Sequence, residues 1–197
     1  MYKKAVTEIQ IILCFCAAFF VAERMGNVQL SDRKWKAFKV KDVFDSIVPT
    51  KGRTTNELVK GEDIPYIAAS KTNNGYAGMY TLESCRNMIS KGNAIVFIQL
   101  GDGAAGMAYY EPMDFIGMKG KTSCGYSSKL NQYVGIFLAR CLSVNKEKFS
   151  HGHSWTGSRL KNTEVMLPVR DDGEPDYQFM EDYIKELMLK KYFQYLI

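Results

Sequence analysis

The chain has 197 residues, of which 46% are hydrophobic and 24% charged, and this composition lies within the ordinary limits of a globular protein with one buried core. Its five cysteines are odd in number and form no Cys-x-x-Cys pair, which argues against a disulfide framework or a zinc knuckle and favours a reducing cytoplasm. The formal net charge is +5, yet residues 33–170 are basic and residues 171–197 are acidic. A basic body favours a polyanionic partner, and an acidic end favours a protein partner.

Residues 1–30 are expected to form an N-terminal extension outside the main domain. Lys3 and Lys4 precede an apolar stretch at 11–22 that has the charge and length of a signal-peptide core but is short for a membrane span. The bulky Phe20 makes cleavage after Ala22 unfavourable. Translation that begins at Met25 is the preferred interpretation, and export or a buried helix are the alternatives.

From Trp35 onward, short segments separated by turns predict a β-rich α+β domain. Residues 35–47 alternate apolar and polar positions before a basic turn, and residues 64–70 form a short strand candidate. The turn that follows contains Asn74 and Gly75, which tolerate positive φ. Residues 93–100 are the strongest strand prediction, and residues 107–112 are expected to pair with them.

The second half of the chain contains two apolar segments. Residues 133–142 suit either a buried helix or a strand, because periodicity alone does not decide between them. Pro175 and Asp176 are start signals for an amphipathic C-terminal helix, whose apolar face carries Met180, Ile184, Leu187 and Met188. The residues expected in the core are Trp35, Phe38, Phe44, Ile64, Ile67, Ile95, Phe97, Ile98, Ile136, Phe137, Leu138 and Leu167.

The hexapeptide GDGAAG at 101–106 matches the GxGxxG pattern of dinucleotide and S-adenosylmethionine sites. Its context opposes that reading, because Gly106 is followed by strand formers and Pro112 instead of a helix. Ser123 also stands about twenty residues further on, where a dinucleotide site needs an acid. The sequence therefore favours a hairpin turn here.

A polar segment at 149–159 carries His151, His153, Ser154 and Arg159. These residue types suit a metal or nucleophile site, and a small metal-dependent hydrolase or nuclease that uses His151 and His153 is the main alternative function. A metal site would need further ligands that the sequence does not place. A polar surface loop in contact with phosphate is the favoured interpretation, and an exported β-rich binding module is a third hypothesis.

The motifs argue against an enzyme that cleaves or methylates DNA by itself. Asp176, Glu181 and Lys185 have the wrong spacing for the usual nuclease arrangement, and helix capping with surface charge explains them better. The sequence contains neither an NPPY-like tetrapeptide for a flipped adenine nor a GxxxxGK[ST] loop for nucleotide hydrolysis.

Four segments in order resemble the target-recognition domains of type I restriction specificity (S) subunits and the similar S subunits of type IIB or IIG-like enzymes. These segments are LSDRKWKAFKVKDVF at 30–44, GEDIPYIAASKTNNGYAG at 61–78, GNAIVFIQLGDGAAGMAYY at 92–110 and RLKNTEVMLPVRDDGEPDYQFMEDYIKEL at 159–187. Each segment is weak by itself, but their order makes the resemblance fairly specific.

The resemblance implies a DNA target-recognition domain at 31–170 and a C-terminal helix at 171–197 for dimerisation or methyltransferase docking through Met180, Ile184, Leu187 and Met188. It implies a non-catalytic cytoplasmic subunit that binds double-stranded DNA and a methyltransferase subunit, and leaves a nuclease subunit open. S-adenosylmethionine, Mg²⁺ and ATP, if used, would bind the partner subunits. Typical S subunits have two recognition domains, so a single one predicts a half-subunit that pairs as a homodimer or with a second recognition domain.

Turn residues are the candidates for DNA contacts, since phosphate contacts give affinity and base contacts give sequence preference. Asn amides can pair bidentately with adenine, and hydroxyl groups donate or accept. Each residue could instead be an ordinary solvated turn residue. The phosphate candidates are Lys51, Arg53, Lys71, Lys119, Lys121, Lys129 and Arg159; the base candidates are Thr72, Asn73, Asn74, Tyr76, Ser127, Ser128, His151 and His153.

Overall fold

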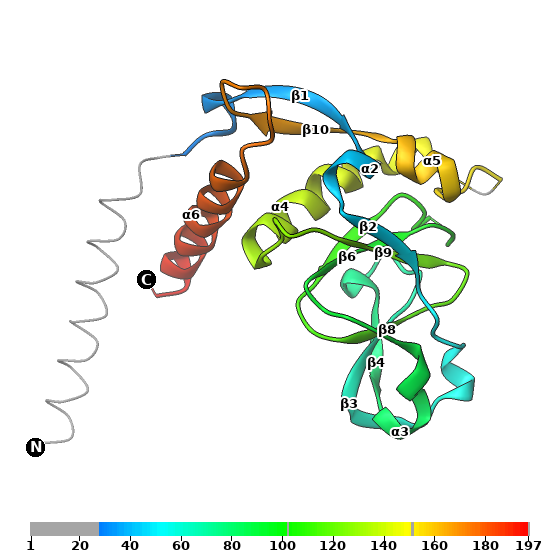
Figure 1. Cartoon of the computed structure of the whole chain (residues 1–197). Coiled ribbons are helices and arrows are strands. Elements are labelled where there is room, and N and C mark those ends of the chain that lie inside the picture. The colour runs from blue at the N-terminus through cyan, green and yellow to red at the C-terminus, as the bar shows by residue number, and fades with distance from the viewer. Residues whose placement is uncertain (1–27, 102, 151, 197) are drawn as a thin grey trace, which may run out of the picture.

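The computed structural model of the chain describes residues 28–101, 103–150 and 152–196 (Figure 1). The fold is α+β, as the sequence predicts. The questions of an N-terminal extension, a signal peptide and a start at Met25 lie outside the described residues. None of the described helices is long and apolar enough to cross a membrane.

Short strands and helices alternate through the described chain. The strands are β1 (Lys34–Lys39), β2 (Ser46–Pro49), β3 (Lys60–Ile67), β4 (Tyr76–Tyr80), β5 (Ile89–Ser90), β6 (Ala94–Ile98), β7 (Ala108–Glu111), β8 (Phe115–Gly117), β9 (Thr122–Tyr126) and β10 (Glu164–Val169). The α-helices are α2 (Val40–Val43), α3 (Leu82–Cys85), α4 (Gln132–Ser143), α5 (Gly157–Asn162) and α6 (Tyr177–Leu196). The 3-10 turns are η1 (Leu30–Asp32), η2 (Thr55–Glu57), η3 (Asn73–Gly75), η4 (Arg86–Met88) and η5 (Val144–Lys148).

Two four-stranded sheets and a two-stranded ribbon organise these elements. The first sheet has the order β2-β9-β6-β7 and is antiparallel throughout, and the second has the order β4-β3-β8-β5. The ribbon pairs β1 with β10. The β6–β7 hairpin across residues 101–106 confirms the predicted pairing and the turn interpretation of GDGAAG.

The cores form between these layers. One face of the first sheet packs with α4, α6, the ribbon and α5, around side chains such as Phe97, Leu138 and Met180. Its other face meets the second sheet around Val96 and Phe115. The far side of the second sheet has a smaller cluster around Tyr66, so the body is layered.

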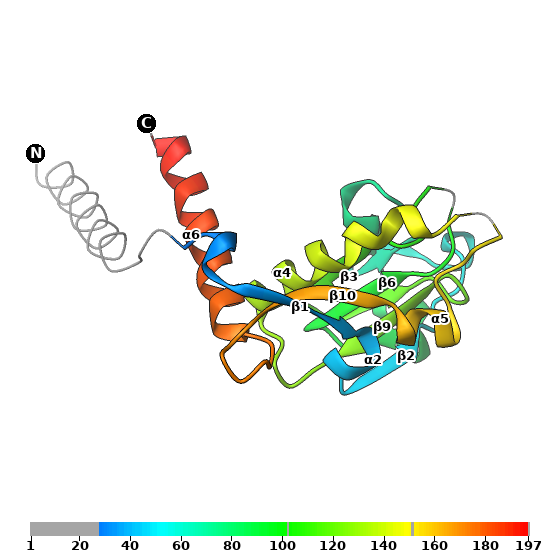
Figure 2. The ribbon, with the colours of Figure 1, turned by 90° about the horizontal axis from the view of Figure 1, so that it is seen from above.

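The ribbon connects the body to α6. Its register runs from Lys34 opposite Val169 to Lys39 opposite Glu164. Viewed from above, the ribbon extends from the start of α6 to α2 and α5 (Figure 2). The alternating stretch 35–47 is therefore not one strand, because β1 ends at Lys39 and a helical turn separates it from β2.

The C-terminal helix begins as the sequence predicts. The Asp176 Oδ1 accepts a hydrogen bond from the Phe179 backbone N–H at 3.0 Å, which caps the first turn. Arg33 donates to the other carboxylate oxygen at 2.9 Å. Burial would raise the Asp176 pKa, but these hydrogen bonds hold it below the ordinary value. Helix α6 then packs on α4, where Phe137 and Tyr183 meet edge to face at 5.8 Å.

Segment 133–142 lies in helix α4, which settles the choice between helix and strand. The Asn131 side chain caps it by accepting from the N–H groups of Tyr133 and Val134. The expected core residues Phe44, Ile64, Ile67, Ile95, Phe97, Ile98, Phe137, Leu138 and Leu167 are buried, and Trp35 and Phe38 are half-buried. Ile136 was wrongly predicted to be core, because the helix turns it outward and leaves it 36% exposed.

Candidate nucleic-acid interface

Several turns meet at one end of the first sheet. In this antiparallel sheet, β2 and β6 end where β9 and β7 begin, so the segments that follow or precede those ends must lie together. We call this region the recognition edge, comprising residues 50–53, 68–75, 99–101, 103–106, 118–121, 150 and 152–155. The segments are distant in sequence, and the sheet topology alone brings them together.

Backbone hydrogen bonds join these segments. The Lys119 N–H donates to the Gly52 carbonyl at 2.7 Å, and the Gln99 N–H donates to the Lys121 carbonyl at 2.8 Å. The Gln99 carbonyl in turn accepts from the Trp155 N–H at 3.0 Å. Backbone hydrogen bonds therefore link the segments of the recognition edge and fix the relative positions of the residues on it.

Five predicted phosphate contacts gather on this edge and are exposed: Lys51, Arg53, Lys71, Lys119 and Lys121. The Lys71 Nζ lies 3.7 Å from the position that a Cβ on Gly103 would occupy, which places the lysine against the β6–β7 turn. Arg53 meets Glu57 at 3.7 Å, but both side chains are more than half exposed, and such a pair is weak. The edge is thus basic and open to a polyanion.

The turn that carries Asn73 and Asn74 belongs to the same edge. Both residues adopt left-handed backbone, with φ of 48° and 52°, and Gly75 follows at 80°. The Gly75 N–H donates to the Thr72 carbonyl at 2.9 Å, while the Ser70 and Thr72 hydroxyls lie 3.0 Å apart. Thr72, Asn73 and Asn74 are exposed, so their polar groups can meet base edges.

Tyr76 follows this turn directly, as the first residue of β4. Its side chain is 47% exposed.

His153, on the edge, and Arg159, beside it, line an open groove of about 470 Å³ that Lys148 and Glu164 also line. Arg159 Nη1 donates to the Ser154 carbonyl at 2.5 Å, which holds the guanidinium over this segment. The groove can accept an anion through its positive side chains. His151 lies outside the described residues.

Support for the hydrolase alternative is lacking in the described residues. No group of three His, Cys, Asp or Glu side chains within the described parts of the chain is arranged to hold a metal ion. Ser154 lies 3.2 Å from the Thr156 hydroxyl and is not activated by a described histidine contact. The arrangement near His153 suits anion contact better than nucleophilic chemistry.

Ser127, Ser128 and Lys129 lie at the opposite end of the sheet, beyond the end of β9. The Ser128 N–H donates to the Asp45 carboxylate at 2.6 Å, and Asp42 lines the same cleft of about 610 Å³. These carboxylates would repel a phosphate backbone. The structure therefore separates this part of the predicted site from the recognition edge.

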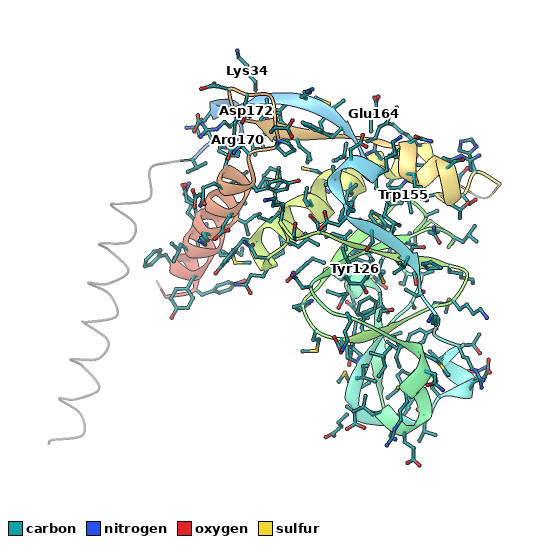
Figure 3. The ribbon with its side chains drawn as sticks, in the orientation of Figure 1. Lys34, Tyr126, Trp155, Glu164, Arg170 and Asp172 are labelled. Carbon is teal, nitrogen blue, oxygen red and sulfur yellow. The ribbon has the colours of Figure 1, made fainter. Side chains whose placement is uncertain are left out.

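Trp155 is the largest feature that sequence reasoning missed, since its segment was taken as a polar loop. The side chain is fully buried and packs edge to face on Phe97 at 5.3 Å between α5 and the first sheet (Figure 3). Its Nε1 donates to the Thr163 hydroxyl at 2.9 Å. The tryptophan within this polar segment could have predicted burial, because tryptophan has a large apolar surface that is usually removed from water.

The predicted partner-binding residues on α6 divide into two groups. Met180 and Ile184 are buried in the chain's own core, at 0% and 7% exposure. Leu187 and Met188 are 44% and 43% exposed. Only the second pair is available to another molecule in this fold, together with the exposed Tyr192 further along the helix.

One carboxylate lies within the body. Glu111, on β7, faces the core between the two sheets beside Cys124 and is 8% exposed. Burial raises its pKa from 4.5 to about 7. No hydrogen bond or ion pair to this carboxylate is found among the described residues. Glu111 is therefore a buried acid whose charged form is disfavoured, away from the recognition edge.

This fold is that of restriction specificity subunits. The S subunit of the type I restriction-modification system from M. genitalium superposes with a TM-score of 0.54 at 13% identity, over 85% of this chain and 42% of that one. The HsdS subunit from Thermoanaerobacter tengcongensis gives 0.52 at 14% identity, over 80% and 39% respectively. Because the sequence identities are only 13% and 14%, these two structures establish a shared fold and nothing further.

Sequence relationship identifies the family. The specificity subunit S.BcgI of the type II restriction enzyme BgcI from Heyndrickxia coagulans is 27% identical over 161 residues, which are 80% of this chain and 45% of that protein. The family described as type I restriction modification DNA specificity domain matches residues 32–193, and the chain belongs to it. The resemblance seen in the four sequence segments is thereby confirmed. The chain spans less than half the length of these relatives.

Proposed function

We propose that this chain is a non-catalytic subunit that recognises a sequence in double-stranded DNA and directs a partner methyltransferase to it. The observation that carries the proposal is the recognition edge, where exposed lysines and a rigid asparagine turn share one surface in a member of a DNA specificity family. Positive side chains supply affinity for any DNA, and the amides supply preference for a base.

The two kinds of contact occupy neighbouring parts of the edge. Lys119 and Lys121 flank the β8–β9 turn, whose Gly120 has a positive φ and no other atom within 4 Å of the position of a Cβ. Such an open turn can approach a phosphate backbone. Asn73 and Asn74 stand on the turn before β4, and each amide can offer both a donor and an acceptor to adenine. Phosphate contacts would set the register in which these amides read a base.

The second part of the proposal concerns assembly. Leu187 and Met188 form an exposed apolar pair on helix α6, which suits docking of a methyltransferase subunit or a second recognition domain, including another copy of this chain. A nuclease subunit could join the same complex. S-adenosylmethionine, Mg²⁺ and ATP, if used, would bind the partner subunits, and the complex would act in the cytoplasm.

The test is co-expression with a methyltransferase subunit from the same genome, followed by mapping of modified adenines across the host genome. We expect a modified motif that appears only when the chain is present. A palindromic motif would support two copies in the complex. Identical modification with and without the chain would contradict the proposal.

A matched pair of variants tests the docking surface in the same cells. Replacing Leu187 and Met188 by Ser should abolish co-purification of the methyltransferase and leave the isolated chain folded, because both side chains are already exposed. Val59, which directly precedes β3 and is 62% exposed, provides the control when changed to Ser. If the α6 variant retains the methyltransferase as well as the Val59→Ser control does, α6 is not the docking element.

A further inference from the structure

Tyr109 is a buried tyrosine whose hydroxyl reaches the turn that carries the asparagines. It lies on β7, is 6% exposed, and packs its ring in the core between the two sheets. The hydroxyl donates to the Ser70 carbonyl at 2.9 Å. The ring edge also lies 3.4 Å from the position that a Cβ on Gly75 would occupy. One rigid side chain therefore supports both ends of the turn at 70–75.

This support matters because the turn places two consecutive asparagines at positive φ. Asparagine tolerates this region better than most residues with a side chain, but it is still less favoured than negative φ, and contacts with the surrounding structure offset the cost. Contacts close in sequence hold the turn: the Ser70 and Thr72 hydroxyls meet, the Gly75 N–H donates to the Thr72 carbonyl, and the Ala68 N–H donates to the Gly75 carbonyl at 2.8 Å. The Tyr109 hydroxyl adds an anchor from the folded body, 39 residues away in sequence.

We propose that Tyr109 is a positioning residue for base recognition: it fixes the turn so that Asn73 and Asn74 present their amides at one distance and angle to the DNA. This inference rests on the proposed function. A nearly buried tyrosine does not itself reach DNA, so its effect passes through the turn. Pre-organisation improves the match to the correct base, while phosphate contacts by lysines elsewhere on the edge are insensitive to it.

The adjacent residue offers a matched control. Tyr110 also donates its hydroxyl, to Asn93 Oδ1 at 3.0 Å, but Asn93 lies at the opposite end of the sheet, before β6 begins. Tyr109→Phe and Tyr110→Phe therefore remove the same atom and one hydrogen bond each. Only the first removes a contact to the recognition edge.

The experiment uses the full chain with its methyltransferase subunit and duplexes that carry the modified motif, each single-base variant of it, and random sequence. For Tyr109→Phe we expect discrimination at one or two motif positions to fall about three- to tenfold, the effect of losing one hydrogen bond, with unchanged affinity for random DNA. Tyr110→Phe should retain wild-type discrimination. The two variants should have similar melting temperatures.

A double-mutant cycle with Asn73→Ala tests the route of the effect. If Tyr109 acts through the turn, its effect depends on Asn73. In the Asn73→Ala background, Tyr109→Phe should then cause little further loss of discrimination at the base pair that Asn73 reads. Retained discrimination in Tyr109→Phe, or an equal loss on specific and random DNA, would overturn the inference while leaving the proposed function intact. Absence of discrimination by the wild-type complex would instead overturn the proposed function and this inference with it.

Discussion

Replacing Glu111 by Gln should raise the free energy of unfolding relative to the wild type, and this gain should be larger at alkaline pH than at acid pH. Burial raises the pKa of this carboxyl from 4.5 to about 7, so the folded state holds the proton more tightly than the unfolded state. As pH rises from 4.5 through about 7, the wild type loses stability because an uncompensated charge forms inside the body. The glutamine does not titrate and avoids this loss.

The magnitude follows from the size of the shift. Since one pKa unit corresponds to about 1.4 kcal/mol, the ceiling is roughly 3.5 kcal/mol. The side chain keeps some contact with solvent, which screens the charge, so we expect about 2 kcal/mol. For a chain of this length, about 2 kcal/mol corresponds to a shift in Tm of roughly 4 to 8 °C.

Urea unfolding of both proteins at pH 5 and pH 8 measures the effect, because the difference between the two pH values cancels any pH-independent effect of the amide. Glu62→Gln on the exposed part of β3 is the control for loss of a negative charge at the surface. A Glu111→Gln stability change that is the same at pH 5 and pH 8, or matched by Glu62→Gln, would refute the reasoning.

Further substitutions separate function from stability. Lys121→Ala should weaken binding to all DNA sequences and reduce the slope of log affinity against log salt by about 1, whereas Asn73→Ala should change preference at one base; binding titrations on specific and random duplexes at several salt concentrations distinguish them. Trp155→Ala should lower the free energy of unfolding by about 3 to 5 kcal/mol, measured in urea. Asp176→Ala should cost about 1 kcal/mol through loss of the helix cap. Because the pKa of that carboxyl is lowered in the fold, the Asp176 contribution is present above its ordinary value of 3.8 and should disappear as pH falls below it, as melting curves between pH 2 and pH 7 would show.

Locally determined features were predictable from the sequence. The β6–β7 hairpin follows from strong strand formers on both sides of a glycine-rich turn, and the start of α6 follows from a proline and a capping aspartate. Positive φ at Asn74 and Gly75 likewise depends on residue type. In each case the information lies within a few residues of the feature.

Features that depend on distant contacts were not predictable in this way. Lys121 and Ser128 are seven positions apart and both look like polar turn residues, yet β9 carries them to opposite ends of the sheet. Ile136 belongs to an apolar run in which nearly every residue looks buried, and only the direction of the helix decides which one faces outward. Trp155 is buried because Phe97 and Phe149 happen to surround it.

The ribbon of β1 and β10 brings the two ends of the body, Val40 and Thr163, next to each other. Both ends of the body leave the ribbon side by side, where the Val40 N–H donates to the Thr163 carbonyl at 2.9 Å. A gene segment that encodes residues 40–163 could therefore be exchanged for another without altering the path of the chain into α6. The exchanged segment would need to keep the face of α4 that packs against α6. Under the proposed function, such an exchange would change the DNA sequence that is recognised and leave helix α6 unchanged.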